Sequence, residues 1–380
     1  MNDEVQYDDK NEDENLSTEI PKEQRILRTQ AYDKSINDIV SMIRDDEVVL
    51  SPDFQRNYLW DNKKASLLVE SILLNVPIPV IYVAEEDDSK WSVVDGLQRL
   101  NSLRRFFDNE FKLTGLEVLS ELKGLQFSTL NPKAARLLKN GILRIILIFK
   151  ESNPEIKYDI FMRLNRGSIK LSEQELRNCL YRGKLNNLID DRLRHYPQFL
   201  KLIGFTEVHK RFVDSELIVR YFTLSENFNK QTGKIDDYKG RIVSAMNRFY
   251  EKHKTISEDE LEALESKFIF TIDKVHKVIG ESAFQRLAGD GTSDGRLNRS
   301  LMDCVMLSFE DYALEALLQN KQAIVKMHQS LPTDDKKFGE AITLGTSDKK
   351  RIELRLTTWA NNLATTMGKP QPYHPQDASD

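Results

Sequence analysis

The chain has 380 residues, of which 40% are hydrophobic, and its net charge is −5. This is enough apolar material for one large domain or two ordinary ones. No stretch approaches the roughly 20 uncharged apolar residues that span a bilayer, and the acidic first 30 residues lack the basic and apolar regions of a signal peptide. We therefore expect a cytoplasmic protein with no membrane partner.

The charge is unevenly distributed. Residues 1–20 contain eight acids and one lysine, a net −7 against −5 for the whole chain, so the remaining 360 residues carry +2. Such an acidic, apolar-poor opening predicts a disordered tail over residues 1–28. The two cysteines, Cys179 and Cys304, have no second cysteine or histidine at ligand spacing, which predicts buried, reduced thiols rather than a zinc site.

The first half of the chain mixes helix and strand patterns. Apolar residues at helical spacing predict a helix that begins near Ser35, and a short strand follows at 48–50. A helix over 62–74, strands over 80–84 and 91–94, and a helix from Leu97 come next. The β-branched run 142–149 predicts an interior strand. Pro154 opens a helix, and Ser172 with Glu175 forms a capping-box pattern before another.

From about residue 185 the strand patterns become rare. Five segments between 215 and 367 carry apolar residues every three or four positions, as helices do. The predicted class is α+β, with an α+β domain over 29–184, an all-helical domain over 185–367 and a disordered tail over 368–380.

The stretch "VVDGLQRLNSL", residues 93–103, brings Asp95 and Gly96 to the point where a strand passes into a helix. Exposed N–H groups at a helix start favour a phosphate, and Gly96 permits its close approach. Asp95 could hold a metal ion or orient a water, while Arg99 could reach a phosphate oxygen. The alternative is an ordinary helix start with Asp95 as its cap and Gln98 and Arg99 in solvent.

The stretch "PDFQRNYLW", residues 52–60, mixes aromatic and polar side chains without a helical or alternating period. An aromatic ring beside Arg56 could hold a base by stacking and a phosphate by charge. The alternative interpretation places the aromatic residues in the core and pairs Arg56 with an acid such as Asp53. We favour the core for the aromatics and a site for Arg56.

The stretch "YDIFMRLNRGSIKLSEQELRNCLYRG", residues 158–183, is locally cationic, and Asn165 marks a helix end. Its basic residues could contact DNA, or Arg163 and Arg177 could cover helix faces and pair with Glu173 or Glu175. The basic residues of the stretch are Arg163, Arg166, Lys170, Arg177 and Arg182.

Together, "DFQRNYLW", "VVDGLQRLNSL" and "IFMRLNRGSIKLSEQELRN" resemble, in this order, the signature stretches of the ParB/sulfiredoxin-like N-terminal domain of GmrSD-type modification-dependent restriction enzymes. That family usually shows FQR-x-Y-x-W, then DGQQRL, then F-x-x-x-N followed by L-x-x-x-E-L-R. Later helical segments also look like the family, so the resemblance covers roughly residues 30–365.

The resemblance implies a domain whose DGQQR loop binds and hydrolyses a nucleoside triphosphate, coupled to recognition of modified DNA in phage defence. It assigns catalysis to Asp95, Gln98 and Arg99, with Asp95 also a ligand of a divalent cation, most simply Mg²⁺. It also implies phosphate or nucleotide contacts from Gln55, Arg56, Arg163 and Asn165, to which the turn itself adds Gly96. The candidate DNA contacts come from the cationic third stretch and are Arg166, Lys170, Arg177 and Arg182.

Two departures from the family bear on activity. Leu97 stands where the family usually has its first glutamine, and if that amide orients the attacking water or a phosphate, leucine would slow or abolish hydrolysis while leaving binding possible. Many members also carry a His-rich HNH nuclease domain, and the last 50 residues contain a single histidine, His374, so we expect no such domain here.

Two alternatives from other classes remain open. One is a non-catalytic DNA-binding module in which the same pocket holds a nucleotide as a switch, and the other is a nuclease that cuts through the ParB-like pocket. A separately encoded nuclease or DNA-modification partner would fit any of these functions, and homo-oligomerisation is left open by the sequence.

Overall fold

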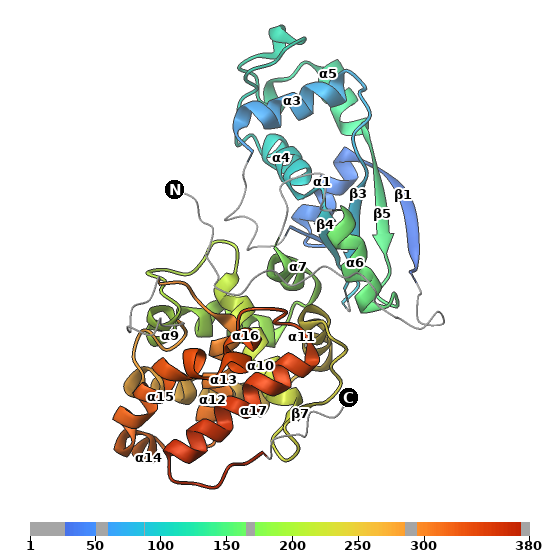
Figure 1. The fold of residues 1–380 in the computed structure, drawn as a ribbon. Coiled ribbons are helices and arrows are strands. Elements are labelled where there is room, and N and C mark those ends of the chain that lie inside the picture. The colour runs from blue at the N-terminus through green and yellow to red at the C-terminus, as the bar shows by residue number, and fades with distance from the viewer. Residues whose placement is uncertain (1–26, 51–59, 87, 165–171, 286–294, 374–380) are drawn as a thin grey trace. The chain divides into compact units, whose positions relative to one another are not determined.

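The computed structural model describes residues 27–50, 60–86, 88–164, 172–285 and 295–373. They form two compact units, one within Glu19–Leu171 and the other from Ser172 onward. We call them the α/β unit and the helical unit and describe each by itself (Figure 1). The predicted α+β class is confirmed, because one unit contains a five-stranded sheet and the other is built mainly of helices.

The α/β unit is a mixed sheet with helices packed on it. The strand order is β1-β5-β3-β4-β2; β3 is parallel to β5 and antiparallel to β4, β2 is parallel to β4, and β1 is antiparallel to β5. Its elements are β1 (Thr29–Ser35), α1 (Ile36–Arg44), β2 (Val48–Val49), α3 (Asn62–Leu73), β3 (Ile81–Glu85), β4 (Trp91–Asp95), α4 (Leu97–Phe107), the 3₁₀ turns η2 (Ser120–Leu122) and η3 (Phe127–Thr129), α5 (Pro132–Asn140), β5 (Ile142–Ile148) and α6 (Pro154–Leu164).

Alternating side chains on the strands build the core of this unit. In β5, Leu143, Ile145 and Leu147 are buried while Arg144 between them is exposed, which is the period of two expected for a strand with one face on a core. These residues join one core cluster with apolar residues of α1, α3 and α4. As predicted, β5 is an interior strand, flanked by β1 and β3.

Local caps fix where the helices of this unit begin. The Ser35 side chain accepts a hydrogen bond from the N–H of Asp38 at 3.1 Å, which confirms the predicted start of α1. Asp61 caps α3 in the same way, accepting from the N–H of Lys64 at 2.8 Å. Farther along α3, the buried Glu70 carboxylate accepts backbone N–H groups of residues 117–119 at 2.7–3.1 Å. Helix α3 is thereby held at both ends.

The helical unit begins with the predicted capping box. The Ser172 side chain accepts from the N–H of Glu175 at 3.1 Å, and the Glu175 carboxylate accepts from the N–H of Ser172. The principal elements are α7 (Glu173–Leu180), α8 (Lys184–Asn187), a π-helical turn (Leu188–Arg192), a 3₁₀ turn (Leu193–His195), α9 (Pro197–Leu202), α10 (Val213–Asn227), β6 (Phe228–Asn229), β7 (Lys234–Ile235), α11 (Ile242–Lys252), α12 (Glu258–Val278), α13 (Arg299–Phe309), α14 (Leu314–Gln319), α15 (Lys321–Asp334), α16 (Lys336–Ala341) and α17 (Lys349–Thr366).

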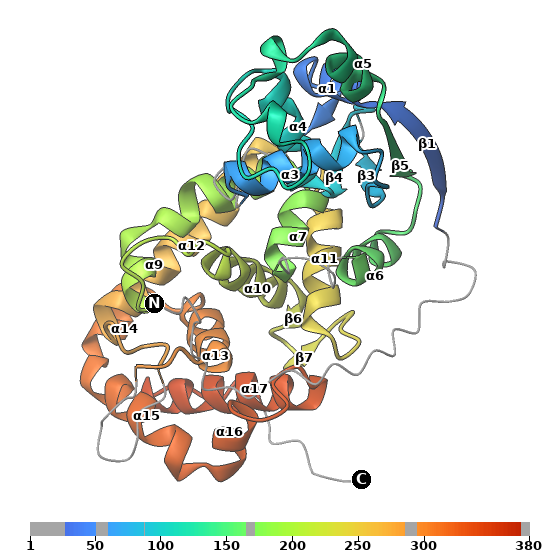
Figure 2. The same cartoon turned by 90° about the horizontal axis from the view of Figure 1, so that it is seen from above.

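A buried ion triad crosses the centre of the helical unit. Asp303 of α13 accepts two hydrogen bonds from Arg220 of α10 and one from Arg355 of α17, each at 2.9 Å. All three side chains are almost fully buried, so removing one partner would leave an uncompensated charge in the core. The triad therefore ties three helices together, and α17 also packs along α13, α15 and α16 (Figure 2).

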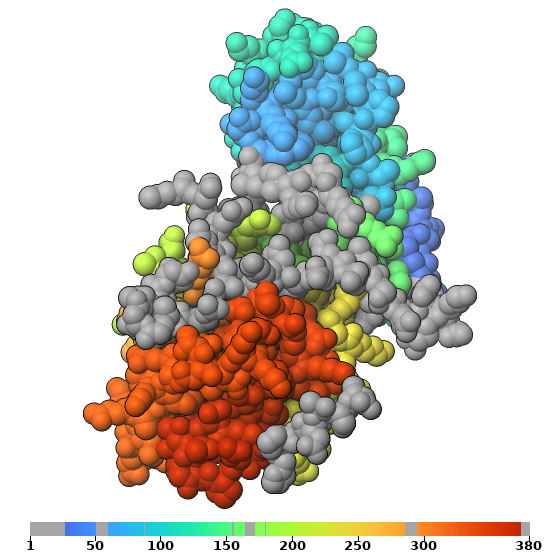
Figure 3. Space-filling view, in the orientation of Figure 1, coloured from blue at the N-terminus to red at the C-terminus, as the bar shows by residue number. Residues whose placement is uncertain are grey.

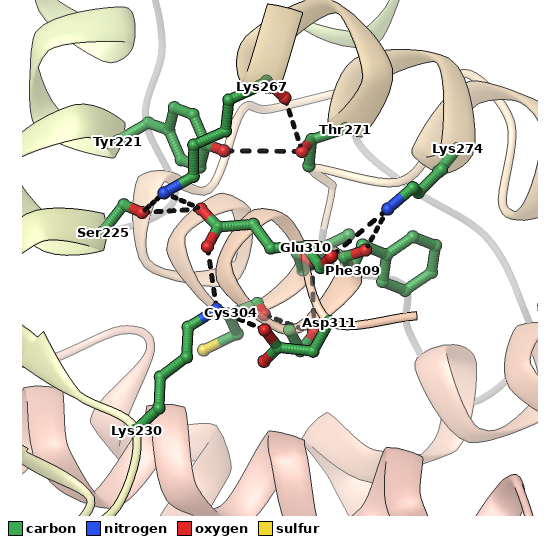
Figure 4. A network of polar contacts seen from close by, with 12 residues as sticks. Tyr221, Ser225, Lys230, Lys267, Thr271, Lys274, Cys304, Phe309, Glu310 and Asp311 are labelled. Atoms are coloured by element: carbon green, nitrogen blue, oxygen red, sulfur yellow. Dashed lines mark hydrogen bonds and ion pairs between the residues drawn. The ribbon is translucent and has the colours of Figure 1, made fainter. Parts of the chain in front are cut away.

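A second polar network closes the end of α13. Glu310 accepts from Ser225 at 2.7 Å and pairs with Lys230 at 2.9 Å and Lys267 at 3.2 Å. The Lys274 ammonium donates to the carbonyls of Phe309 at 3.0 Å and Glu310 at 3.3 Å (Figure 4). A cation at the C-terminus of a helix satisfies carbonyls that have no partner within the helix. We assign this network a structural role.

Candidate functional site

The β4–α4 turn of the α/β unit positions the central motif. Asp95 is the last residue of β4 and lies opposite Tyr82 of β3, next to a shift in the register of the two strands. Gly96 follows at φ +103° and is the N-cap of α4, which has neither a side-chain cap nor an acid in its first turn. Gly96 thus offers no side chain to cap the first N–H groups of α4, and N–H groups at a helix start favour a bound anion.

Glycine is required at this turn for two reasons. A left-handed backbone with positive φ is unfavourable for residues with a Cβ atom. In addition, a Cβ at position 96 would lie 2.9 Å from Cγ1 of Ile81, a fully buried residue of β3. The chain can pass from β4 into α4 this close to β3 only with glycine.

Asp95 and Arg99 form an ion pair one helical turn apart. The Arg99 Nη2 donates to Asp95 Oδ2 at 2.7 Å, and the side chains are 12% and 29% exposed, respectively. The Arg99 Nη1 donates to the carbonyls of Pro79, and of Val80 at 3.3 Å. Arg99 is thus fixed by three groups from two segments but still reaches the surface.

Both residues line a pocket of about 640 Å³. One face of α3 and the segment 76–79 form its largely apolar walls, and Asp95 and Arg99 supply polar groups. The complete described lining is Trp60, Lys64, Leu67, Leu68, Ser71, Val76, Pro77, Ile78, Pro79, Asp95 and Arg99. In Figure 3, the mid-blue segment that carries α3 lies on the visible face of this unit. An apolar cleft with a few convergent charged groups is the usual form of a small-molecule site.

Two pocket residues were not anticipated as site residues. Trp60 was expected to plug the core, and the structure shows that it packs against the core cluster and also lines the pocket. Lys64 was not singled out at all. The signal for it was present in the sequence, because "NKKASLLVESIL" starts a helix with two lysines and no acid in its first turn.

The other residues of the central motif are described but do not line the pocket. Gln98 is half-buried in the first turn of α4, and Leu97 packs against the core of the unit. Leu97 therefore has a packing role at the position where the family usually has an amide.

Five predicted site residues lie outside the described residues. They are Gln55, Arg56, Asn165, Arg166 and Lys170. Arg163 is described, is exposed in the last turn of α6, and is absent from the described lining of the pocket. The roles given to these residues stay predictions.

Arg177 lies inside the helical unit. Its side chain is fully buried, with Nε 2.9 Å from Asn247 Oδ1, Nη1 3.1 Å from Gln174 Oε1 and Nη2 3.5 Å from Glu173 Oε2. Of the two interpretations of the cationic stretch, the structure agrees with the one in which Arg177 pairs with Glu173. A guanidinium enclosed in this way offers no donor to DNA. Arg182 is half-buried, and its Nη2 is buried without a hydrogen bond to the described residues.

Metal-binding side chains are sparse in the part of the chain that the structure describes. Nowhere in it do three His, Cys, Asp or Glu side chains gather as ligands. In the pocket, Asp95 is the single described carboxylate, and one of its oxygens is bound by Arg99. Mg²⁺ commonly binds through one or two carboxylates together with substrate phosphates. The described residues thus fit an ion that enters with a nucleotide, and they do not form a complete metal site.

The fold and the pocket define an α/β domain with a pocket beside a glycine-containing strand-to-helix turn. The family model described as "GmrSD restriction endonuclease, N-terminal domain" matches residues 36–182. This segment is therefore a GmrSD-type N-terminal domain, which confirms the resemblance inferred from the three motifs. No curated protein and no solved structure matches the chain.

The matched segment extends beyond the α/β unit. It runs from α1 through α7, so it includes the first helix of the helical unit. The match indicates a restriction-type defence protein that associates with DNA.

Within the described ranges, no helix is long and apolar enough to cross a membrane.

Proposed function

We propose that this protein binds a nucleoside triphosphate in the pocket of the α/β unit and hydrolyses it in restriction-type defence against modified or foreign DNA. The observation that carries the proposal is the β4–α4 turn. It brings Asp95, the last residue of β4, and Arg99, in the first turn of α4, together at one pocket. Arginine and helix N–H groups are the donors that proteins commonly use for phosphates.

The apolar walls give the pocket two chemically different parts. Leu67, Val76 and Ile78 offer contact surface to a base or ribose, and Asp95 and Arg99 supply charged groups. Arg56 precedes Trp60 of the lining by four residues, so at most about 14 Å of extended chain separates them. Chain connectivity thus permits the predicted contribution of Gln55 and Arg56 to the same pocket.

In the proposed mechanism, Arg99 and the α4 N–H groups stabilise the negative charge of the phosphates. Arg99 does not need to reorganise, because Asp95 and two carbonyls already hold its guanidinium. The Asp95 oxygen that Arg99 does not bind orients the attacking water or contributes to the binding of Mg²⁺. When bound with the nucleotide, Mg²⁺ would neutralise further phosphate charge.

Leu97 favours a second candidate function. Its side chain has no amide that could position a water or a phosphate, and it packs against the core of the unit. A chain that binds nucleotide without turnover could use the pocket as a switch that controls association with DNA. The two candidates share the pocket and differ in whether phosphate is released.

Phosphate release by the purified full chain with Mg²⁺ and each ribonucleoside triphosphate tests the hydrolase. We expect release by the parent and its loss in Asp95→Asn. A control is Asp108→Asn at the other end of α4, which removes the i,i+4 ion pair with Arg104 at 3.1 Å and the pair with Arg44 at 2.5 Å, outside the described pocket lining. Equal loss in both variants would point to a general effect on the unit. Binding without release by the parent would favour the switch.

The DNA part of the proposal needs its own assay. We expect modified DNA to raise phosphate release, or to bind more tightly with nucleotide present, and unmodified DNA to do so less. Identical behaviour with and without DNA would contradict it.

A further inference from the structure

Helix α3 brings a second cation to the pocket. Lys64, Leu67, Leu68 and Ser71 follow one another at the spacing i, i+3, i+4 and i+7, so a single face of α3 lines the cavity. The Ser71 hydroxyl donates to the carbonyl of Leu67 at 2.8 Å, within its own helix. The face therefore presents one charged side chain, Lys64, and it lies at the N-terminal end of α3.

Lys64 occupies an electrostatically unfavourable place in its helix. The first turn of α3 contains no acid, and both Lys63 and Lys64 lie in it, at the positive end of the helix dipole. Asp61 caps the helix through the backbone N–H of Lys64. The position of the ammonium is thus not explained by the stability of α3.

Nor does an ion pair account for Lys64. Its exposed ammonium has no carboxylate partner among the described residues, whereas Lys90 pairs with Asp46 at 2.5 Å in the same unit. The Lys64 Nζ lies instead 4.8 Å from the ring centroid of Trp60. A cation–π contact at an exposed site is weak and easily exchanged for a stronger partner.

The surroundings of Lys64 fit an anion attached to a flat apolar group. The pocket carries two cations, Lys64 and Arg99, against one described acid, Asp95, which Arg99 already binds. A smaller hollow of about 360 Å³, lined by Asp61, Lys63, Lys64 and Leu67, shares Lys64 and Leu67 with the pocket. Trp60 stands beside it with a ring that can stack on a base.

We propose that Lys64 is a phosphate-binding residue of this pocket and that Trp60 stacks on the base of the same nucleotide. The ammonium exchanges its contact with the Trp60 ring for a phosphate oxygen, a charge-assisted contact. The ligand class is a nucleoside polyphosphate, held by Arg99 and Lys64 at its anionic end. This inference rests on the proposed function and adds the residues that determine affinity.

The test compares triphosphates with nucleosides. Dissociation constants of ATP, GTP, adenosine and guanosine are measured calorimetrically for the full-length parent and for Lys64→Ala, Lys64→Arg and Trp60→Leu. Because a hydrogen bond to a charged group contributes about 1.5–3 kcal/mol, Lys64→Ala should weaken triphosphate binding about tenfold or more. It should leave nucleoside binding nearly unchanged, Lys64→Arg should restore most of the triphosphate affinity, and Trp60→Leu should weaken both ligand types.

Lys34 provides a matched control, because its ammonium lies 5.9 Å from the Trp91 ring centroid in the same unit but outside the described pocket lining. Lys34→Ala should bind triphosphate as the parent does. The inference is overturned if Lys64→Ala keeps the parental triphosphate affinity while Arg99→Ala loses it, and the proposed function then still stands. If the parent binds no triphosphate, the proposed function fails and this inference fails with it.

Discussion

Replacing Gly96 by alanine should destabilise the α/β unit through two separable effects. The left-handed backbone at φ +103° costs a residue with a Cβ about 1–2 kcal/mol. The new methyl would lie 2.9 Å from Ile81 Cγ1, and such overpacking costs about 1–3 kcal/mol. The lower entropy of the unfolded alanine chain offsets about 0.4–1 kcal/mol. The net expectation is a loss of about 2 kcal/mol or more.

Two other glycines of the same unit separate the effects. Gly124 has φ +82° and open space around its Cβ position, so Gly124→Ala tests backbone strain alone. Gly141 has an ordinary φ of −55°, but a Cβ there would lie 2.9 Å from Ile36 Cδ1, so Gly141→Ala tests crowding alone. Each should cost about 1 kcal/mol, less than Gly96→Ala.

Hydrogen exchange of peptides from β3 and α4, measured across a urea series, reports the opening of the α/β unit separately from the helical unit. In a separate thermal unfolding experiment, a loss of about 2 kcal/mol should lower the melting temperature by about 4–8 °C for a domain of this size. If Gly96→Ala costs no more than Gly124→Ala, the close approach of β4–α4 to Ile81 is not what requires glycine.

Three further predictions concern other parts of the chain. Arg177→Met should lower the unfolding free energy of the helical unit by about 2–3 kcal/mol, because a buried charged donor with three acceptors is lost. It should leave the salt dependence of DNA binding unchanged. Altered DNA binding at unchanged stability would restore Arg177 as a DNA contact. Leu97→Gln should raise the rate of phosphate release above that of the parent, while its nucleotide dissociation constant stays within about threefold of the parental value, as expected for a group that acts mainly in the transition state. An unchanged rate of release would show that the side chain at position 97 does not limit hydrolysis. Burial lowers the pKa of His328 to about 4, below the usual value near 6.5. The contribution of neutral His328 to the unfolding free energy is therefore fully present above pH 6.5 and should fall by about 3 kcal/mol as the pH drops towards 4. A His328→Leu variant whose unfolding free energy has the same pH dependence in this range would refute the assignment.

Much of the α/β unit could be predicted because its local signals agree with its tertiary structure. The Ser35 cap, the helix before Pro77 and the β-branched run of β5 each appear in the sequence where the structure has them, as does the Ser172 cap of the helical unit. Strand β1 was missed, since "TQAYDKS" is largely exposed and is defined by its pairing with β5 rather than by an apolar pattern.

The helical unit shows the same limit of local reasoning. Segment 299–318 has one continuous helical pattern but forms two helices, α13 and α14. The ion pairs of Asp303 and Glu310 join residues more than 40 positions apart, and no spacing rule connects them. Cys304 is buried as predicted.

The site was predictable where one short motif makes it and less so elsewhere. Asp95, Gly96 and Arg99 lie close together because they belong to one short strand-to-helix connection, in which Arg99 is four residues after Asp95. Lys64 joins them only through the packing of α3 against α4, which is a tertiary fact. Arg177 was assigned to a surface because its basic neighbours were read as one patch, although its partners Gln174 and Asn247 enclose it.

The most direct test of the central claim is a structure of the full chain with Mg²⁺ and a non-hydrolysable nucleoside triphosphate. We expect phosphate oxygens within hydrogen-bond distance of the Arg99 guanidinium and of the first N–H groups of α4, with the ligand inside the cavity between α3 and segment 76–79. A nucleotide bound at any other place, with Asp95 and Arg99 still paired only to each other and to the carbonyls of residues 79 and 80, would contradict it.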